Sequence, residues 1–250
     1  MICIYHRTDF DGKCSGAIVL NKHPDCKMYG FDYQDVFEID RIDPGENVIM
    51  VDMTLEKPGQ MGWLIQKAGE ITWIDHHITT LDIEEKYNAK SFPGYRQLSS
   101  NSDDPKGKNS KNRISASELC WKYFYPTRSM PYAVHLLGRY DVWDKSDLYH
   151  WDNEILPFQY GMRIKNLFPE DQDYWKLLFR TDERSELIQD IIRDGRAALA
   201  YDENLSEKMA KGLWFPIEFE GFKFQAINRS LANSHSAKSV WNPEEFDGVM

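Results

Sequence analysis

Three short apolar runs that each end in acidic or histidine residues constrain the fold of this 250-residue chain more than any other feature. Short apolar runs bounded by charge are typical of buried strands in a parallel sheet. A weaker strand and two helical patterns separate the runs, and this alternation predicts an α/β fold with a doubly wound parallel sheet. The predicted strands are residues 2–5, 27–31, 48–51 and 71–74, and the predicted helices between them are 13–22 and 58–65.

Charged and metal-binding side chains follow the apolar strands. Parallel strands present their carboxyl ends at one edge of a sheet, which is where open α/β proteins bind ligands. Carboxylate oxygens combined with imidazole nitrogens suit a borderline cation such as Mn²⁺. Each motif alone has a simpler interpretation, because an acidic turn often caps a helix. Together they predict a two-metal hydrolase site formed by His6, Asp9, Asp11, Asp52, Asp75, His76 and His77.

Separate roles are predicted for four of the motif positions. Asp52 is predicted to give one oxygen to each of two cations that lie about 3.5–4 Å apart. His76 is predicted to be a ligand, and Asp75 to orient it or a neighbour. We expect His77 to face the substrate, because two adjacent residues on a strand point to opposite faces.

Asp141 is a further predicted ligand, on a helix expected at residues 131–143. It follows Val134 and Leu137 on the apolar stripe of that helix, and a buried carboxylate is costly unless it is paired or bound to metal. Asp144 could take the same part. An ion pair of Asp141 with Arg139 or Lys145 is the simpler alternative.

This ordered set of motifs resembles the DHH phosphoesterase superfamily, named for the Asp-His-His that stands here as Asp75-His76-His77. The resemblance covers residues 1–165, and more loosely the helix that follows. Its other motifs match His6, Asp9, Asp11 and Gly12 with Ser15, then Asp52, and then Asp141 within Gly138-Arg139-Tyr140-Asp141.

The resemblance implies a bilobed hydrolase with two Mn²⁺ ions, for which Mg²⁺ or Co²⁺ could substitute. It implies manganese-dependent hydrolysis of short oligonucleotides or nucleotide phosphates, as an exonuclease-like phosphodiesterase or a nucleotide phosphatase. His77 would contact the scissile phosphate, with Asp75 beside it as the second catalytic residue. One ion would be held by His6, Asp9 and Asp52, and the other by Asp11, Asp52, His76 and Asp141.

The rest of the chain is predicted to be mostly helical. Helices are expected at 115–125, 131–143, 156–164, 174–179 and 186–201, followed by a hairpin at 213–220 and 222–227. We therefore expect a DHH domain at 1–165, a helical linker at 166–204, and the start of a DHHA1-like α/β lobe at 205–250. That lobe is expected to be incomplete, and the Gly-Gly-Gly-His sequence usual in such lobes is absent.

A polar stretch at 99–112 is predicted to be an exposed loop. The alternative is a lid whose basic side chains meet a phosphate chain. Arg113 and Ser115, which follow it, are predicted substrate contacts. The basic side chains of the lid hypothesis are Lys106, Lys108, Lys111 and Arg113.

The net charge of −10 disfavours stable binding to long DNA or RNA, which needs clustered Lys and Arg, but not binding of small anionic substrates at metals. Four scattered cysteines without a C-x-x-C pair favour a cytoplasmic location and argue against structural zinc. No apolar stretch is long enough to cross a bilayer, so no membrane partner is expected. Oligomerisation stays open. Two alternative functions also remain, a pyrophosphatase-like hydrolase and a nucleotide-binding module without turnover.

Overall fold

A four-stranded parallel sheet forms the centre of the computed structural model, which describes residues 1–78, 81–88, 92, 103, 108–228 and 240–249. The strand order is β2-β1-β3-β4, and every neighbouring pair is parallel. The predicted α/β class and parallel sheet are therefore confirmed. The strands are β1 (Ile2–His6), β2 (Lys27–Phe31), β3 (Val48–Val51) and β4 (Ile71–Ile74).

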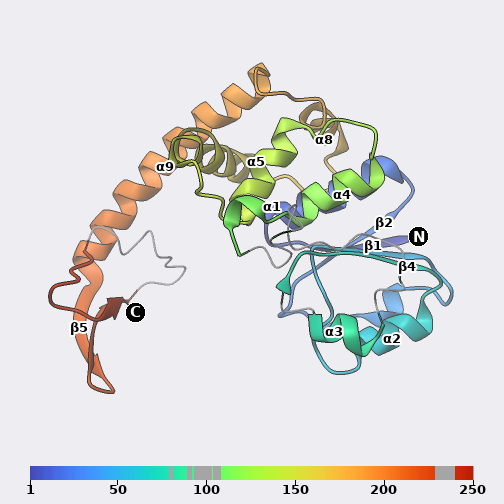
Figure 1. Cartoon of the computed structure of the whole chain (residues 1–250), viewed down its shortest axis with the longest axis horizontal. Helices are drawn as coiled ribbons and strands as arrows, with labels where there is room; N and C mark the ends of the chain where they lie inside the picture. Colours follow the sequence, from blue (N-terminus) through green and yellow to red (C-terminus); the bar gives the residue numbers. More distant parts are fainter. Residues whose placement is uncertain (79–80, 89–91, 93–102, 104–107, 229–239, 250) are drawn as a thin grey trace.

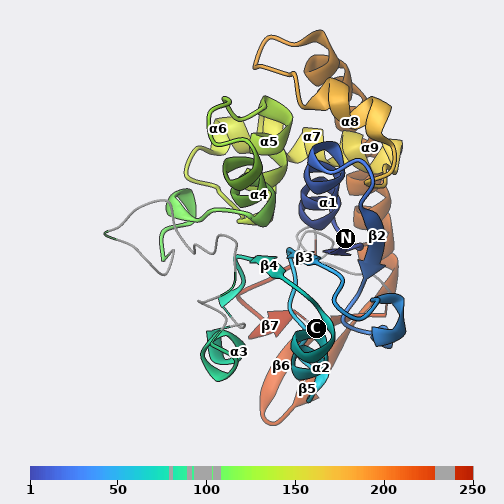
Figure 2. The ribbon, with the colours of Figure 1, turned by 90° about the vertical axis from the view of Figure 1, so that its right-hand side faces the viewer.

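Helices cover both faces of the sheet. Helices α2 (Gln60–Lys67) and α3 (Leu81–Lys86) lie on one face, and α1 (Phe10–Lys22), α4 and α5 lie on the other (Figures 1 and 2). This is the doubly wound arrangement that the alternating pattern predicts. The remaining helices are α4 (Ala116–Phe124), α5 (Tyr132–Asp141), α6 (Leu148–His150), a π-helical turn (Trp151–Ile155), α7 (Leu156–Lys165), α8 (Gln172–Leu178) and α9 (Glu186–Leu213).

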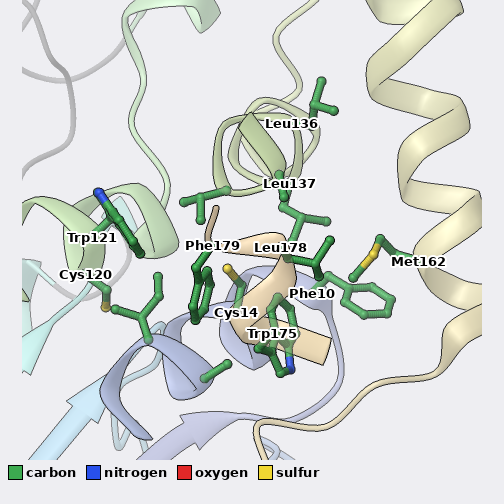
Figure 3. Packing of buried hydrophobic residues seen from close by; sticks show 14 of the residues in the cluster. Phe10, Cys14, Cys120, Trp121, Leu136, Leu137, Met162, Trp175, Leu178 and Phe179 are labelled. Carbon is green, nitrogen blue, oxygen red and sulfur yellow. The ribbon is translucent and has the colours of Figure 1, made fainter. Parts of the chain in front are cut away.

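Two hydrophobic clusters hold this arrangement, one on each face of the sheet. The larger cluster joins α1, α4 and α5 to α7, α8 and α9, and Figure 3 shows its centre. Trp175 and Phe158 are completely buried there, and burying an aromatic side chain of this size contributes roughly 2–3 kcal/mol. The packing fixes α1, α4 and α5 above the sheet, and these helices carry site residues.

Helix α1 begins at Phe10, three residues before the predicted start at Lys13. The difference arises from capping, since the side chain of Asp9 accepts a hydrogen bond of 2.9 Å from the backbone N–H of Gly12. A side-chain cap satisfies backbone N–H groups of the first turn, so the helix begins directly after Asp9. The start of α1 therefore holds Asp9 and Asp11 close to the end of β1.

Helix α9 continues to Leu213, beyond the predicted end at residue 201. The apolar stripe of α9 ends where the helix leaves the core. Residues of high helix propensity continue the helix beyond that point, and Lys211 Nζ lies 2.6 Å from Glu207 Oε1 as an ion pair one turn apart. The predicted boundary at residue 205 falls inside this helix. The division into domains stays a prediction.

A small three-stranded sheet follows α9, away from the parallel sheet (Figure 1). β5 (Trp214–Phe219) and β6 (Phe222–Ile227) form the predicted hairpin around Glu220 and Gly221, and β7 (Gly248–Val249) pairs with β6.

Of the predicted 99–112 loop, the structure describes residues 103 and 108–112, and Lys106 lies outside the described residues. Among the described helices, none combines the length and apolar character that a bilayer crossing needs.

Candidate metal centre

The carboxyl ends of β1, β3 and β4 meet at one edge of the sheet. Tyr5 is paired with Val51, and Val51 with Ile74, so the residues after these positions lie side by side. His6, Asp52 and the Asp75–His77 segment come from these three positions. The register of three separate strands therefore brings the predicted groups together.

One group of possible ligands consists of His6, Asp9 and Asp52. The His6 Nδ1 atom lies 2.9 Å from Asp9 Oδ2 and 3.7 Å from Asp52 Oδ2. Gly12 permits this approach of α1 to β1, because a Cβ at that position would lie 2.0 Å from the His6 carbonyl oxygen. A larger residue at position 12 would displace His6 or α1.

A second group consists of Asp11, His76 and Asp141. The His76 Nε2 atom lies 3.2 Å from Asp141 Oδ2, 3.8 Å from Asp11 Oδ2 and 3.5 Å from Asp52 Oδ1. Asp52 thus directs Oδ2 towards the first group and Oδ1 towards the second. One carboxylate shared in this way between two ligand groups is the geometry expected of a bridging ligand.

The polar atoms at this edge fit divalent cations. Within the part of the chain that the structure describes, both carboxylate oxygens of Asp52, His6 Nδ1, His76 Nε2 and Asp141 Oδ2 are buried without a hydrogen-bond partner. Asp52 is only 1% exposed and has a left-handed backbone with φ of 55°. Buried polar atoms without hydrogen bonds and backbone strain at a non-glycine residue are both costly. A bound cation would offset the first cost, and a set of imidazole nitrogens and carboxylate oxygens suits a divalent metal ion.

The electrostatics of the centre also favour a cation. Burial together with repulsion from Asp11 and Asp9 raises the pKa of Asp52 well above its usual range. Burial and the nearby Asp11 do the same to the pKa of Asp141. Burial acts to lower the pKa of His6, but the nearby carboxylates of Asp52 and Asp9 outweigh it and raise that pKa to about 10. Because their pKa values are raised, Asp52 and Asp141 keep their protons to a higher pH than free carboxyls do, and a metal ion can displace these protons.

His76 and His77 do not point to opposite faces, and this expectation was wrong. Strand β4 ends at Ile74, so both residues lie past the pleated segment and their ring centroids are 4.6 Å apart. Their partners still differ. His76 faces the acidic groups, whereas His77 Nδ1 lies 2.7 Å from Oδ1 of the buried Asp75. That contact outweighs the effect of burial and raises the pKa of His77.

Asp11 is held by the amino end of α4. Its Oδ2 accepts a hydrogen bond of 2.8 Å from the Ala116 N–H, and its Oδ1 accepts one of 3.0 Å from the Ser117 N–H. Helix N-termini favour negative charge.

Ser115, a predicted substrate contact, is buried and caps α4, while Arg113 is exposed. Substrate contact by either residue stays a prediction.

Glu118 is the main residue that the sequence reasoning missed. It completes a capping box with Ser115 and forms an ion pair with Arg139, whose guanidinium also lies 3.4 Å from Asp144 Oδ2. Glu118 thus ties the helix that holds Asp11 to the helix that ends in Asp141. The Ser115-x-x-Glu118 spacing was the available signal, because it is the sequence pattern of a capping box.

Replacing Glu118 by glutamine is expected to lower the free energy of unfolding by about 3 kcal/mol, because the buried Arg139 guanidinium loses its nearer charged partner and keeps the longer contact with Asp144. Chemical denaturation measures this change. The matched control is Glu38→Gln, which breaks an exposed Glu–Arg pair with Arg41 and should have no measurable effect. Equal stabilities for the two variants would contradict the assignment of Glu118 as a link between α4 and α5.

Comparisons with known proteins give no family assignment. No family model matches the chain, and no curated protein matches it. The chain resembles a crystal structure of an uncharacterized protein from Helicobacter pylori G27, at 11% identity and a TM-score of 0.41, over 90% of this chain and 74% of the other. It also resembles exonuclease RecJ bound to manganese, at 13% identity and a TM-score of 0.42. That likeness covers 85% of this chain and 64% of the RecJ chain, so this chain spans less than two thirds of RecJ's length.

Proposed function

We propose that this protein is a metal-dependent phosphoesterase of the DHH type that hydrolyses short oligonucleotides or nucleotide phosphates with two Mn²⁺ ions. One observation carries the proposal, namely the division of the two Asp52 oxygens between the His6 group and the His76 group. The resemblance of the motifs to the DHH superfamily contributes the choice of Mn²⁺ and of the substrate class.

In this proposal the side chains of the centre hold the metal ions, orient His77 and stabilise negative charge on the substrate. A pair of divalent cations bound at this site would supply Lewis-acid chemistry, which lowers the pKa of a water molecule and polarises a phosphoryl group. His6, Asp9 and Asp52 hold one cation, and a second set consisting of Asp52 with Asp11, His76 and Asp141 holds the other. Asp75 orients His77, whose imidazolium stabilises negative charge on a phosphoryl oxygen.

A screen of phosphate compounds with added Mn²⁺ tests the proposed function. The substrates are dinucleotides, 3′-phosphoadenosine phosphate, cyclic dinucleotides and inorganic pyrophosphate. Release of mononucleotide or of phosphate from the nucleotides supports the proposal. Cleavage of pyrophosphate alone would replace it with the pyrophosphatase alternative, and nucleotide binding without any cleavage would indicate a binding module.

Replacing His77 by alanine is expected to reduce kcat by roughly 10²–10³-fold while both metal ions stay bound, because an electrostatic contact is lost and the metal ligands remain. Elemental analysis and steady-state kinetics on a dinucleotide measure the two quantities. His77→Gln is the companion variant and retains a hydrogen-bond donor. Loss of bound metal in His77→Ala would instead make His77 a ligand, as its grouping with Asp52 and His76 allows.

A further inference from the structure

A cluster of aromatic and basic side chains lies at the end of α5, beside Asp141 in the sequence. We call it the Trp143 cluster, and it consists of Tyr140, Trp143, Lys145, Trp151 and Arg163. The rings of Trp143 and Trp151 lie 4.9 Å apart, and the Tyr140 ring stacks on Trp151 at 5.7 Å. The Lys145 ammonium lies 4.3 Å from the Trp143 ring centroid, and Arg163 donates a hydrogen bond of 3.1 Å to the Tyr140 hydroxyl. The cluster therefore combines π faces with cations next to the candidate metal centre.

The backbone of Trp143 is unusual for its residue type. Its φ is 56°, in the left-handed region that favours glycine. Trp143 N–H bonds to the Tyr140 carbonyl oxygen at 3.1 Å, and Asp144 N–H bonds to the Arg139 carbonyl oxygen at 3.0 Å. These two bonds form a Schellman motif at the end of α5, in which glycine usually occupies the Trp143 position. Helix capping alone therefore does not explain a tryptophan there.

Burial does not explain the tryptophan either, because 49% of the Trp143 surface is exposed. The neighbouring cations are also unusual in a chain with a net charge of −10. Among the residues that the structure describes, neither Lys145 nor Arg163 has a carboxylate partner within ion-pair distance. A half-exposed tryptophan with Lys145 at its ring, and with Arg163 at the ring of Tyr140 in the same cluster, is a surface that suits a planar ring carrying a phosphate.

The distance from the candidate metal centre fits a nucleotide. Only one residue separates Trp143 from Asp141, so their Cα atoms lie within about 8 Å of each other. A base joined through its sugar to a phosphate at the metal centre needs a contact at this range. Among the exposed tryptophans, Trp63 is a useful contrast, because it lies on α2 on the other face of the sheet.

We propose that Trp143 is a stacking platform for a nucleobase and that Lys145 contacts a phosphate of the same ligand. The inference rests on the proposed function and deepens it, since it selects base-bearing phosphates over inorganic pyrophosphate. Stacking on one aromatic side chain strengthens binding of a base by about 5- to 100-fold.

Equilibrium binding of AMP and of ribose 5-phosphate, both with Mn²⁺ present, tests the platform without requiring turnover. The two ligands share a sugar phosphate and differ in the base. Wild type is expected to bind AMP about 5- to 100-fold more tightly than ribose 5-phosphate. Trp143→Gly should remove this preference while it keeps the melting temperature within a few degrees, because glycine suits the backbone. Trp143→Phe should keep most of the preference.

Two further variants test whether the preference for AMP depends on apolar packing alone or on any exposed tryptophan. Trp143→Leu keeps an apolar side chain against Trp151 but has no aromatic face, so it must also lose the preference. Trp63→Ala removes a tryptophan of similar exposure and must keep it. A wild type without preference for AMP, or a Trp143→Gly variant that retains it, would overturn the platform. Either result can occur in a protein that hydrolyses phosphate esters, so the failure of the platform is distinct from failure of the proposed function.

Discussion

Replacing Asp52 by asparagine is expected to abolish hydrolysis and metal pairing while making the metal-free protein more stable. Asparagine has the shape of aspartate, so the fold is kept. It lacks the charge that both ligand groups share, and an amide cannot bridge two cations as a carboxylate does. The gain in stability grows as the pH rises, because asparagine avoids the cost of ionising the buried Asp52 carboxyl beside Asp11 and Asp9.

Three measurements on Asp52→Asn test this prediction together. Elemental analysis gives the number of bound Mn²⁺ ions, kinetics gives turnover, and denaturation in EDTA gives the stability without metal. Asp43→Asn is the matched control, because its carboxylate is exposed and pairs with Lys27. Wild-type turnover or two bound ions in Asp52→Asn would exclude the bridging role. A large loss of stability in EDTA would instead make Asp52 a structural residue.

Mn²⁺ is expected to raise the melting temperature strongly, and more so as the pH rises. A ligand at 1,000 times its dissociation constant stabilises by about 4 kcal/mol, which corresponds to roughly 8–16 °C for a protein of this size. The pH dependence follows from proton displacement. Ligands that retain protons must release them when the cation binds, so affinity for Mn²⁺ increases as protons become scarce.

Without metal, Asp52, Asp141 and His6 make the folded protein less stable as the pH rises. The reason is that folding raises the pKa values of all three groups. The folded chain then binds protons more tightly than the unfolded chain. The stability contributed by the two carboxyls is complete below about pH 4 and is lost as the pH rises through their raised pKa values. That of His6 is complete below about pH 6.5 and is lost as the pH rises through about 10.

Thermal melts in EDTA and in excess Mn²⁺, from about pH 6 to about pH 8, measure both effects. In EDTA, wild type should lose stability relative to Asp52→Asn as the pH rises. In Mn²⁺, wild type should gain stability relative to its own EDTA sample over the same range, and Asp52→Asn should gain little. A metal effect that is absent or that shrinks towards alkaline pH would contradict the candidate centre.

The local sequence pattern was sufficient to place the strands of the parallel sheet. Three of them have the predicted bounds and the fourth differs by one residue, because a short apolar run such as 48–51, ended by a charged residue, is typical of a strand buried on both faces. Helix ends were less predictable. The start of α1 depends on a side-chain cap at Asp9, and the buried residues near the end of α9, Ser206 and Ala210, give only a weak apolar signal in the sequence.

By itself the sequence determined the class of fold and the identity of the polar groups at one edge of the sheet, because the burial period and the residue type that follows each strand are local properties. Only the tertiary structure shows which of Asp141 and Asp144 lies at the candidate metal centre. His76 Nε2 lies 3.2 Å from Asp141 Oδ2, whereas Asp144 lies against Arg139. The tertiary structure also decided how the Asp52 oxygens are shared. These outcomes depend on distances between segments far apart in the chain, and such distances are set by the packing of α4 and α5 on the sheet rather than by any spacing along the sequence.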